Sequence, residues 1–253
     1  MILGKNTIQK NIKLSSKVIF AKTKYQYFFK NLKKNEIYKI SKLTSYSIYI
    51  LDINKKKEIF INEKKINISK GDILQIENME TVVRSLCENL KLLIVGTVKS
   101  KLKEKTIKIT KKSNIYKVNK PWGYELWLNG RHKNYSFKKI FLKKNFRTSL
   151  QFHKKKMETN IIFDGIAELS YKNSGAVDNL EVTKKDISFK KLSSISKIFV
   201  KPNTIHRIKA LTNLMLYEAS TPELDDVIRI SDDSNRKHGL IKKEHKNWAK
   251  FVF

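Results

Sequence analysis

The chain contains a single cysteine, Cys87, among its 253 residues. An internal disulfide is therefore excluded, and the composition suits a reducing compartment. The first residues include no apolar run long enough for a secretory signal peptide. No stretch approaches the ~20 consecutive apolar residues that a membrane-spanning helix needs. These absences predict a soluble, cytoplasmic protein with no membrane partner.

Arginine is also scarce, although the formal net charge is +31. Only six of the 54 basic residues are arginine, and the lysines are scattered along the whole chain. Base readout favours arginine and a binding stripe needs clustered charge, so we expect no specific nucleic-acid partner. The richness in Lys, Asn and Ile is typical of an AT-rich coding sequence. Such a surface should still attract small anions, including sugar phosphates.

Histidine is absent from the first half of the chain, because all five histidines lie after position 131. The first half therefore offers no imidazole to a metal ion. If both halves share one fold, we expect the first to be a structural or dimerising copy.

Apolar residues make up 40% of the sequence, which is enough to form a buried core. Many lie in short runs rich in Ile, Val, Phe and Tyr, broken by Lys, Asn and Asp. Examples are residues 46–52, 58–62, 90–98, 136–142, 160–163, 198–200 and 214–219. Short strands at this spacing predict an all-β sandwich or barrel. Helical periodicity is weak except after Lys237, where Leu240, Ile241, Trp248 and Val252 could line one face of a short helix.

A polar, lysine-rich stretch at residues 99–112 separates two halves with a similar rhythm of strands. In each half a turn, 70–72 or 201–203, precedes two strongly apolar runs, which forms a faint internal repeat. We expect a degenerate N-terminal β domain, a linker, a second β domain and a short tail that can form a helix. The expected boundaries are 1–105, 106–117, 118–236 and 237–253.

Four residues of the second half have the donor chemistry of a metal site. Gln151 and His153 are two apart, so on a strand both side chains share one face. A turn across the next three lysines can bring Glu158 back beside them, and His206 begins another apolar run. Two imidazoles, a carboxylate and an amide oxygen suit Zn²⁺, Mn²⁺, Fe²⁺ or Co²⁺. Spacing alone fits a hydrogen-bonded core histidine equally well, so both interpretations remain open at this point.

Around these residues the sequence resembles the cupin superfamily, and more narrowly the C-terminal cupin domain of type II mannose-6-phosphate isomerases. The resemblance extends from about residue 119 to residue 236 and follows the family's order and intervals. It is carried by residues 120–127 (KPWGYELW), 149–165 (SLQFHKKKMETNIIFDG), 202–207 (PNTIHR) and 218–229 (EASTPELDDVIR), followed by Asp232, Asp233 and Arg236. It implies two cupin-like jelly-roll β-barrels, of which the second carries the site.

The resemblance also implies a site and a chemistry. It assigns Gln151, His153, Glu158 and His206 to one divalent metal ion, with Zn²⁺ favoured over Mn²⁺, Co²⁺ and Fe²⁺. It places Arg229 in the active site. Lys138 matches a basic position on the strand before the ligands and could serve as general base. The family's reaction is aldose–ketose isomerisation of a phosphorylated hexose through an enediol. We therefore expect a mannose-6-phosphate isomerase-like enzyme whose partner is a sugar phosphate.

The sequence departs from the family pattern beside the ligands. Lys154, Lys155 and Thr159 stand where the family has histidines, and residues 144–145 replace its Pro-Gly turn. The ligands are intact but the rim of the pocket is altered. A cupin that acts on another sugar, such as an epimerase, an oxygenase and a non-catalytic sugar-binding cupin therefore remain alternatives. No stretch resembles a glycine-rich nucleotide loop.

Several residues have a structural alternative. Arg229 could pair with Asp225 or Asp226, and Lys138 could be an ordinary surface lysine. Trp122, Tyr124 and Trp127 are predicted to be core or domain-interface aromatics. His132, His238 and His245 lack partners at ligand spacing and are expected on the surface. A homodimer through exposed edge strands follows only by analogy with the fold.

Overall fold

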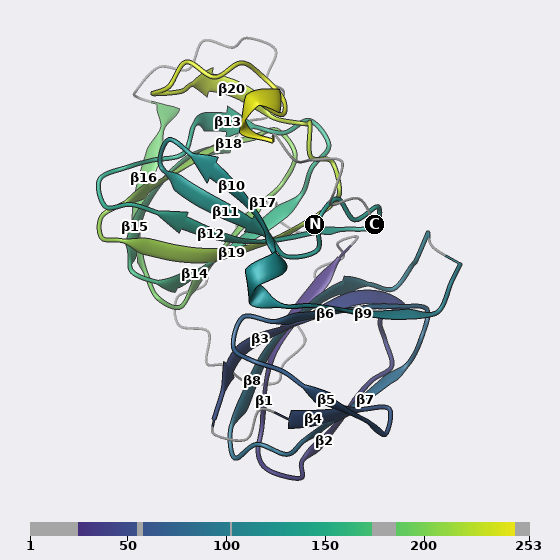
Figure 1. The fold of residues 1–253 in the computed structure, drawn as a ribbon. Coiled ribbons are helices and arrows are strands. Elements are labelled where there is room, and N and C mark those ends of the chain that lie inside the picture. Colours follow the sequence, from purple (N-terminus) through teal and green to yellow (C-terminus); the bar gives the residue numbers. More distant parts are fainter. Residues whose placement is uncertain (1–24, 55–57, 102, 174–185, 246–253) are drawn as a thin grey trace, which may run out of the picture. The chain divides into compact units, whose positions relative to one another are not determined.

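The computed structural model describes residues 25–54, 58–101, 103–173 and 186–245, and every strand pairing in these segments is antiparallel. The chain forms two compact units. Among the described residues, the N-terminal unit comprises 25–116 together with Leu128–Tyr135, and the C-terminal unit comprises Lys117–Trp127 and the residues between 136 and 245 (Figure 1). No helix in the described segments is long and apolar enough to span a membrane.

The N-terminal unit is built from two sheets whose apolar faces share one core. Alternate residues of the strands are buried, as in β7, and the core joins Ile48 and Leu74 of one sheet to Ile59 and Val83 of the other. The five-stranded sheet has the order β1 (Gln26–Leu32), β8 (Leu90–Thr97), β3 (Ser45–Ile53), β6 (Ile73–Glu77) and β9 (Thr106–Thr110). The four-stranded sheet has the order β2 (Ile37–Ile40), β7 (Thr81–Ser85), β4 (Glu58–Ile61) and β5 (Lys64–Asn67).

The C-terminal unit repeats this plan with a larger and a smaller sheet around a second core, which includes Leu142, Ile162, Leu169 and Ile208. The six-stranded sheet has the order β10 (Tyr116–Lys120), β11 (Gly123–Trp127), β12 (Ser136–Leu142), β19 (Leu214–Ser220), β14 (Glu158–Asp164) and β17 (Ser196–Val200). The five-stranded sheet has the order β16 (Ser188–Ser193), β15 (Ile166–Asn173), β18 (Thr204–Ala210), β13 (Leu150–Phe152) and β20 (Ile228–Ser231).

The predicted all-β class is confirmed, and each apolar run named above coincides with a strand. Two segments differ from expectation. The range 106–117, expected to be a linker, contains β9 and a 3-10 turn at Lys112–Asn114. This lysine-rich segment pairs with β6 at the edge of the sheet, and its alternating Ile107 and Ile109 are exposed there. The described part of the tail contains a 3-10 turn, Lys242–Glu244, in place of a helix, and Trp248 and Val252 lie outside the described residues.

The segment Leu128–Tyr135 belongs to the N-terminal unit although the sequence predicts it in the second domain. His132 Nε2 lies 2.7 Å from Glu77 Oε1, and the Tyr135 hydroxyl lies 2.7 Å from Ser47 Oγ. His132 is therefore buried rather than on the surface. Its partner Glu77 lies 55 positions away, so no local sequence pattern predicts the contact.

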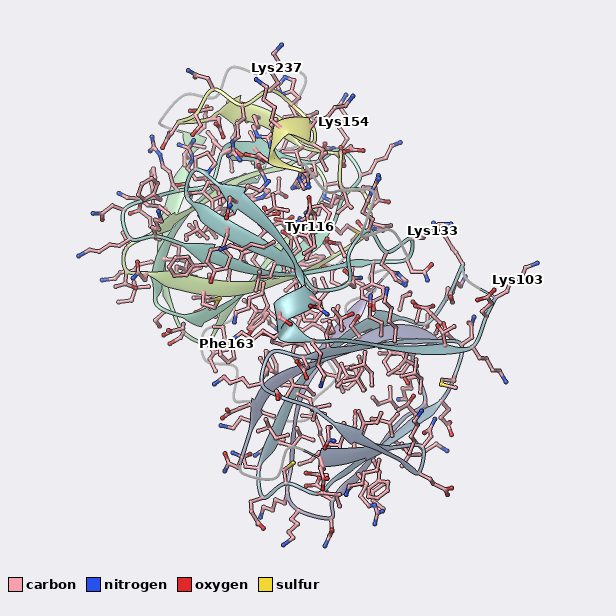
Figure 2. All side chains as sticks on the ribbon, viewed as in Figure 1. Lys103, Tyr116, Lys133, Lys154, Phe163 and Lys237 are labelled. Atoms are coloured by element: carbon pink, nitrogen blue, oxygen red, sulfur yellow. The ribbon has the colours of Figure 1, made fainter. Side chains whose placement is uncertain are left out.

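The lysines are spread over both units. Figure 2 shows the labelled Lys103, Lys133, Lys154 and Lys237 projecting away from the ribbon, and all four are exposed. This scatter accords with a general basic surface rather than one binding stripe.

Candidate metal centre

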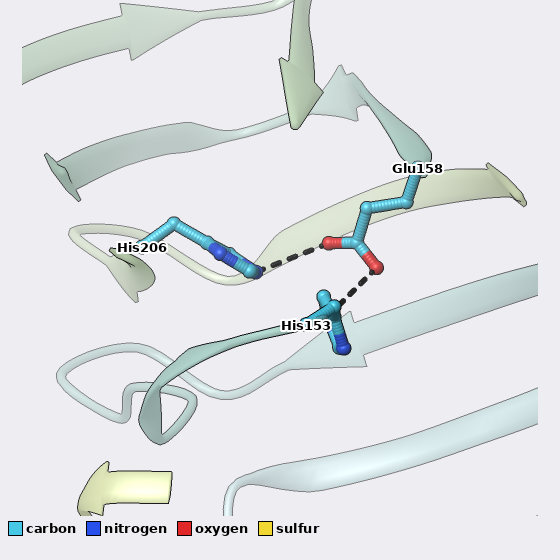
Figure 3. Close-up of side chains that lie close together, drawn as sticks. All are labelled: His153, Glu158 and His206. Carbon is cyan, nitrogen blue, oxygen red and sulfur yellow. Dashed lines mark ion pairs between the residues drawn. The ribbon is translucent and has the colours of Figure 1, made fainter. Parts of the chain in front are cut away.

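Three of the four predicted ligands lie together in the C-terminal unit. His153 directly follows β13, Glu158 begins β14, and His206 lies on β18. His206 Nε2 is 3.1 Å from Glu158 Oε1, and His153 Nε2 is 3.5 Å from Glu158 Oε2 (Figure 3). One donor atom from each residue lies within 4.8 Å of the other two, and all three side chains are buried. This is the cluster of two imidazoles and a carboxylate that the sequence predicts.

A single carboxylate shapes the turn that brings Glu158 back beside His153. Asp226 accepts backbone N–H groups of Lys154, Lys155 and Lys156 at 3.0, 2.5 and 2.8 Å. Burial opposes the charge of Asp226, but these three donors hold its pKa below the ordinary value. Asp226 thus anchors the three-lysine turn and does not pair with Arg229.

The hydrogen bonds of the two imidazoles orient their remaining nitrogens toward Glu158. His153 Nδ1 bonds the backbone oxygen of Asp226, and His206 Nδ1 bonds that of Thr204 at 3.0 Å. A carbonyl accepts only, so each Nδ1 carries a proton and Nε2 is the nitrogen that each ring directs at Glu158. Among the described residues, His153 Nε2 has no hydrogen-bond partner. Two imidazole nitrogens and a carboxylate that converge within 4.8 Å are the donor types of a divalent metal site, so this set fits such an ion.

Gln151, the fourth predicted ligand, lies in the same pocket. It pairs with His206 in the β13–β18 register, and its Oε1 accepts a hydrogen bond from Ser149 Oγ at 2.5 Å. The amide oxygen is thus held on the ligand-bearing sheet. Its role as a ligand remains a prediction.

The pocket around the cluster is strongly charged. Its lining includes Lys120, Lys138, Lys156, Arg229 and Arg236 against the carboxylates Glu125, Glu158 and Glu218. Cations exceed carboxylates by two in the lining itself. Two further carboxylates lie next to it and hold the outer cations: Asp232 pairs with Arg236 at 2.6 Å, and Glu244 with Lys120 at 2.7 Å.

Lys138 is buried, and the alternative of a surface lysine is wrong. Its ammonium is 3.5 Å from Glu218 Oε1 and 3.9 Å from Glu125 Oε2. It also lies 4.7 Å above the ring of Trp127. The contact with Glu218 follows from the register of β12 and β19, in which the two residues are directly opposite.

Arg229 lies on β20, opposite Gln151 of β13. Its Nη1 donates to the backbone oxygens of Lys237 and, at 2.9 Å, of Gly239. Its nearest carboxylate is Asp232, 4.0 Å from Nε, so the expected alternative of a pair with Asp225 or Asp226 is wrong. Nε is buried and has no hydrogen-bond partner among the described residues, which leaves one guanidinium donor available to a ligand.

Lys156 is a site residue that the sequence does not single out, because it looks like part of a solvated run of lysines. Its buried ammonium contacts Glu158 Oε2 at 2.5 Å and Glu218 Oε1 at 2.9 Å. Burial opposes both charges. The attraction still holds the pKa of Glu158 well below, and that of Lys156 well above, the ordinary values.

The tail contributes to the pocket as well. Leu240, Ile241 and His245 line it, and His245 is buried against Trp127 at a ring distance of 5.1 Å. The expectation of a surface position is therefore wrong for His245, whereas His238 is exposed as expected. The apolar residues at 240–241 indicate that this part of the tail packs against the protein, but the sequence does not identify the pocket that it lines.

Glu125 makes the stability of this unit sensitive to acid. Burial raises the pKa of Glu125, but the ammonium groups of Lys120 and Lys138 and the indole N–H of Trp127 lower it to about 2. Because the folded pKa lies below the unfolded value, this stabilisation is present above about pH 4.5 and is lost as the pH falls toward 2. Its size is on the order of 3 kcal/mol at most.

We expect Glu125→Gln to lose less stability than the wild type between pH 5 and pH 3. Urea unfolding followed by tryptophan fluorescence at several pH values measures the difference. Parallel stability curves for the two proteins would show that Glu125 does not carry this dependence.

Comparison with known proteins agrees with this fold. Residues 108–232 match the family model described as mannose-6-phosphate isomerase C-terminal. No curated protein sequence is significantly similar to the chain.

Three solved structures illustrate the likeness of the fold. Oxalate decarboxylase from Lactobacillus farciminis, in a formate complex, has a TM-score of 0.59 and 11% identity over 81% of this chain and 79% of that chain. AerE from Microcystis aeruginosa has a TM-score of 0.56 and 11% identity over 85% and 96%. Procruciferin, an 11S globulin from Brassica napus, has a TM-score of 0.55 and 11% identity over 79% and 76%. At such identities the likeness shows the fold alone. The predicted resemblance to cupins and to the C-terminal domain of mannose-6-phosphate isomerases is confirmed.

Proposed function

We propose that the C-terminal unit is a cytoplasmic, metal-dependent aldose–ketose isomerase that acts on a phosphorylated hexose, as mannose-6-phosphate isomerases do. The observation that carries the proposal is the convergence of His153, Glu158 and His206 in a pocket lined by five cations. The match of residues 108–232 to the isomerase C-terminal family supports it.

The residues that would hold the metal are His153, Glu158 and His206, with Gln151 as a fourth donor beside them. When bound, a divalent ion supplies Lewis-acid stabilisation of negative charge on substrate oxygen, worth several kcal/mol. A mixed nitrogen and oxygen donor set suits Zn²⁺ first, and also Mn²⁺, Co²⁺ or Fe²⁺.

The isomerisation moves a proton between C1 and C2 of the sugar, and Lys138 is our candidate for that transfer. It is a buried lysine on the strand β12, and it lines the same pocket as the ligands. Glu218 and Glu125 fix the position of its ammonium, and the ring of Trp127 covers one side. The neighbouring cations also stabilise the negative charge that develops on the enediol oxygens.

Arg229 is proposed to bind the phosphate, because its buried Nε–H has no hydrogen-bond partner among the described residues. Replacing Arg229 with methionine should raise KM for the phosphorylated sugar at least about tenfold, the loss expected for one charge-assisted hydrogen bond. Arg147→Met is a matched control, since Arg147 is exposed, pairs with Asp233 and does not line the pocket. Equal effects of the two substitutions in steady-state kinetics would exclude this role.

The test of the function is a coupled assay that converts mannose 6-phosphate to fructose 6-phosphate. The full chain is loaded in turn with Zn²⁺, Mn²⁺, Co²⁺ and Fe²⁺, and unphosphorylated mannose serves as the comparison substrate. We expect turnover of the phosphate ester with at least one metal. No turnover with any metal-loaded preparation would contradict the proposal.

The second candidate is a cupin that acts on another sugar, as an epimerase, or one that binds sugar without turnover. Lys154, Lys155 and Thr159, which adjoin the ligands in sequence and depart from the family pattern, favour a different ligand, although none of them lines the pocket itself. That function predicts saturable binding of other sugar phosphates by a metal-loaded protein that leaves mannose 6-phosphate unchanged.

A further inference from the structure

Lys156 places a fixed positive charge against the carboxylate at the centre of the metal cluster. Its ammonium is 2.5 Å from Glu158 Oε2 and its side chain is only 5% exposed. The turn that carries it is fixed by Asp226, which accepts the backbone N–H of Lys156 itself at 2.8 Å. The ammonium is therefore built into the site.

The two oxygens of Glu158 have different surroundings. Oε1 lies 3.1 Å from His206 Nε2 and accepts the Asn160 side-chain amide at 2.9 Å. Oε2 accepts from Lys156 and lies 3.5 Å from His153 Nε2. Oε1 thus faces the imidazole of His206, whereas the charge on Oε2 is already neutralised by the ammonium of Lys156.

Lys156 is shared with a second buried carboxylate. Glu218 Oε1 lies 2.9 Å from its ammonium and 3.5 Å from that of Lys138. If Lys156 were drawn away from Glu158, its charge would still have a partner. The lysine can therefore remain in the pocket when another cation approaches Glu158.

We propose that Lys156 is an internal cation that competes with the divalent metal for Glu158 and keeps metal binding weak and exchangeable. The inference rests on the proposed metal site. When the metal is absent, the ammonium neutralises a carboxylate that would otherwise face two imidazoles. When the metal is bound, the ammonium and the ion share that carboxylate, and like charges a few ångströms apart in a buried pocket repel strongly.

The test is the affinity of the metal-free full chain for Zn²⁺ and for Mn²⁺, measured by competition with a chelating indicator at fixed pH. Lys156→Gln should bind either metal at least about tenfold more tightly than the wild type. Lys156→Arg retains the charge and is the matched control, with an affinity close to that of the wild type. Weaker or unchanged binding by Lys156→Gln would overturn the proposal and leave Lys156 as a structural partner of Glu158.

A second variant keeps the inference testable if Lys156→Gln does not fold. Glu218→Gln removes the other partner of Lys156, so the ammonium should hold Glu158 more strongly and metal affinity should fall several-fold. Glu125→Gln removes a carboxylate of the same pocket that pairs with Lys120 and Lys138 instead, and should change affinity less. Equal effects would contradict the proposal. If the wild type itself binds neither metal, the proposed metal site, and with it the proposed function, is wrong. If the wild type binds metal and Lys156→Gln binds it with the same affinity, only the competition between Lys156 and the metal is excluded.

Discussion

Replacing His206 with alanine is expected to lower kcat/KM for the phosphorylated hexose by roughly a thousandfold or more, equivalent to about 4 kcal/mol of transition-state stabilisation. His206 presents Nε2 to Glu158 at 3.1 Å, and its Nδ1 is held by the backbone oxygen of Thr204. Alanine removes one of three converging donors without changing the strand β18. The lost donor weakens the metal site on which the proposed reaction depends.

His238→Ala is the matched control for this experiment. His238 is exposed and contacts the backbone N–H of Arg229 through Nδ1, outside the metal cluster. Steady-state kinetics with a range of added metal should show little change in this variant. A His206→Ala protein that is folded and retains nearly full activity would contradict the assignment of the site.

Replacing Gly123 with alanine should destabilise the C-terminal unit by about 3 kcal/mol or more. Gly123 begins β11 with φ +151°, a conformation that other residues rarely adopt, and a Cβ there would lie 2.0 Å from the backbone oxygen of Phe141. Gly123 is in the β11–β12 pairing, so the clashing atom belongs to the neighbouring strand. A backbone oxygen held in a sheet cannot move aside as a flexible side chain can.

Gly239→Ala is the control for this substitution. Gly239 also has a positive φ, +70°, but its Cβ would meet nothing closer than the Asp225 backbone oxygen at 3.4 Å. We expect a loss of only about 1 kcal/mol there. Urea unfolding can be followed by tryptophan fluorescence, because Trp122 and Trp127 both lie in the C-terminal unit. Similar losses for the two variants would show that the close approach to Phe141 is not what requires glycine.

The parts of the fold that could be predicted from the sequence are those that depend on local patterns of residues. Apolar runs such as 214–219 became strands because the side chains of a strand alternate between two faces, and one face is buried. The spacing of Gln151, His153 and Glu158 likewise predicts a strand, a turn and a returning strand, and the structure has them.

The charges of the pocket were harder to predict because their partners are distant in sequence. Lys156 pairs with Glu218, 62 positions away, and Lys120 with Glu244, 124 positions away. The register of β12 and β19, which puts Lys138 opposite Glu218, explains the contact of Lys138, and no local pattern in the sequence gives that register. His132 and His245 were misplaced for the same reason, since their partners Glu77 and Trp127 come from other parts of the chain.

The proposed function depends on one divalent ion bound by His153, Glu158 and His206. Titration of the metal-free chain with Zn²⁺, followed by calorimetry at fixed pH, tests it most directly, with His153→Ala titrated in parallel. We expect one bound ion per chain for the wild type and no saturable binding for His153→Ala. Equal binding by the two proteins, or no binding by the wild type, would contradict it.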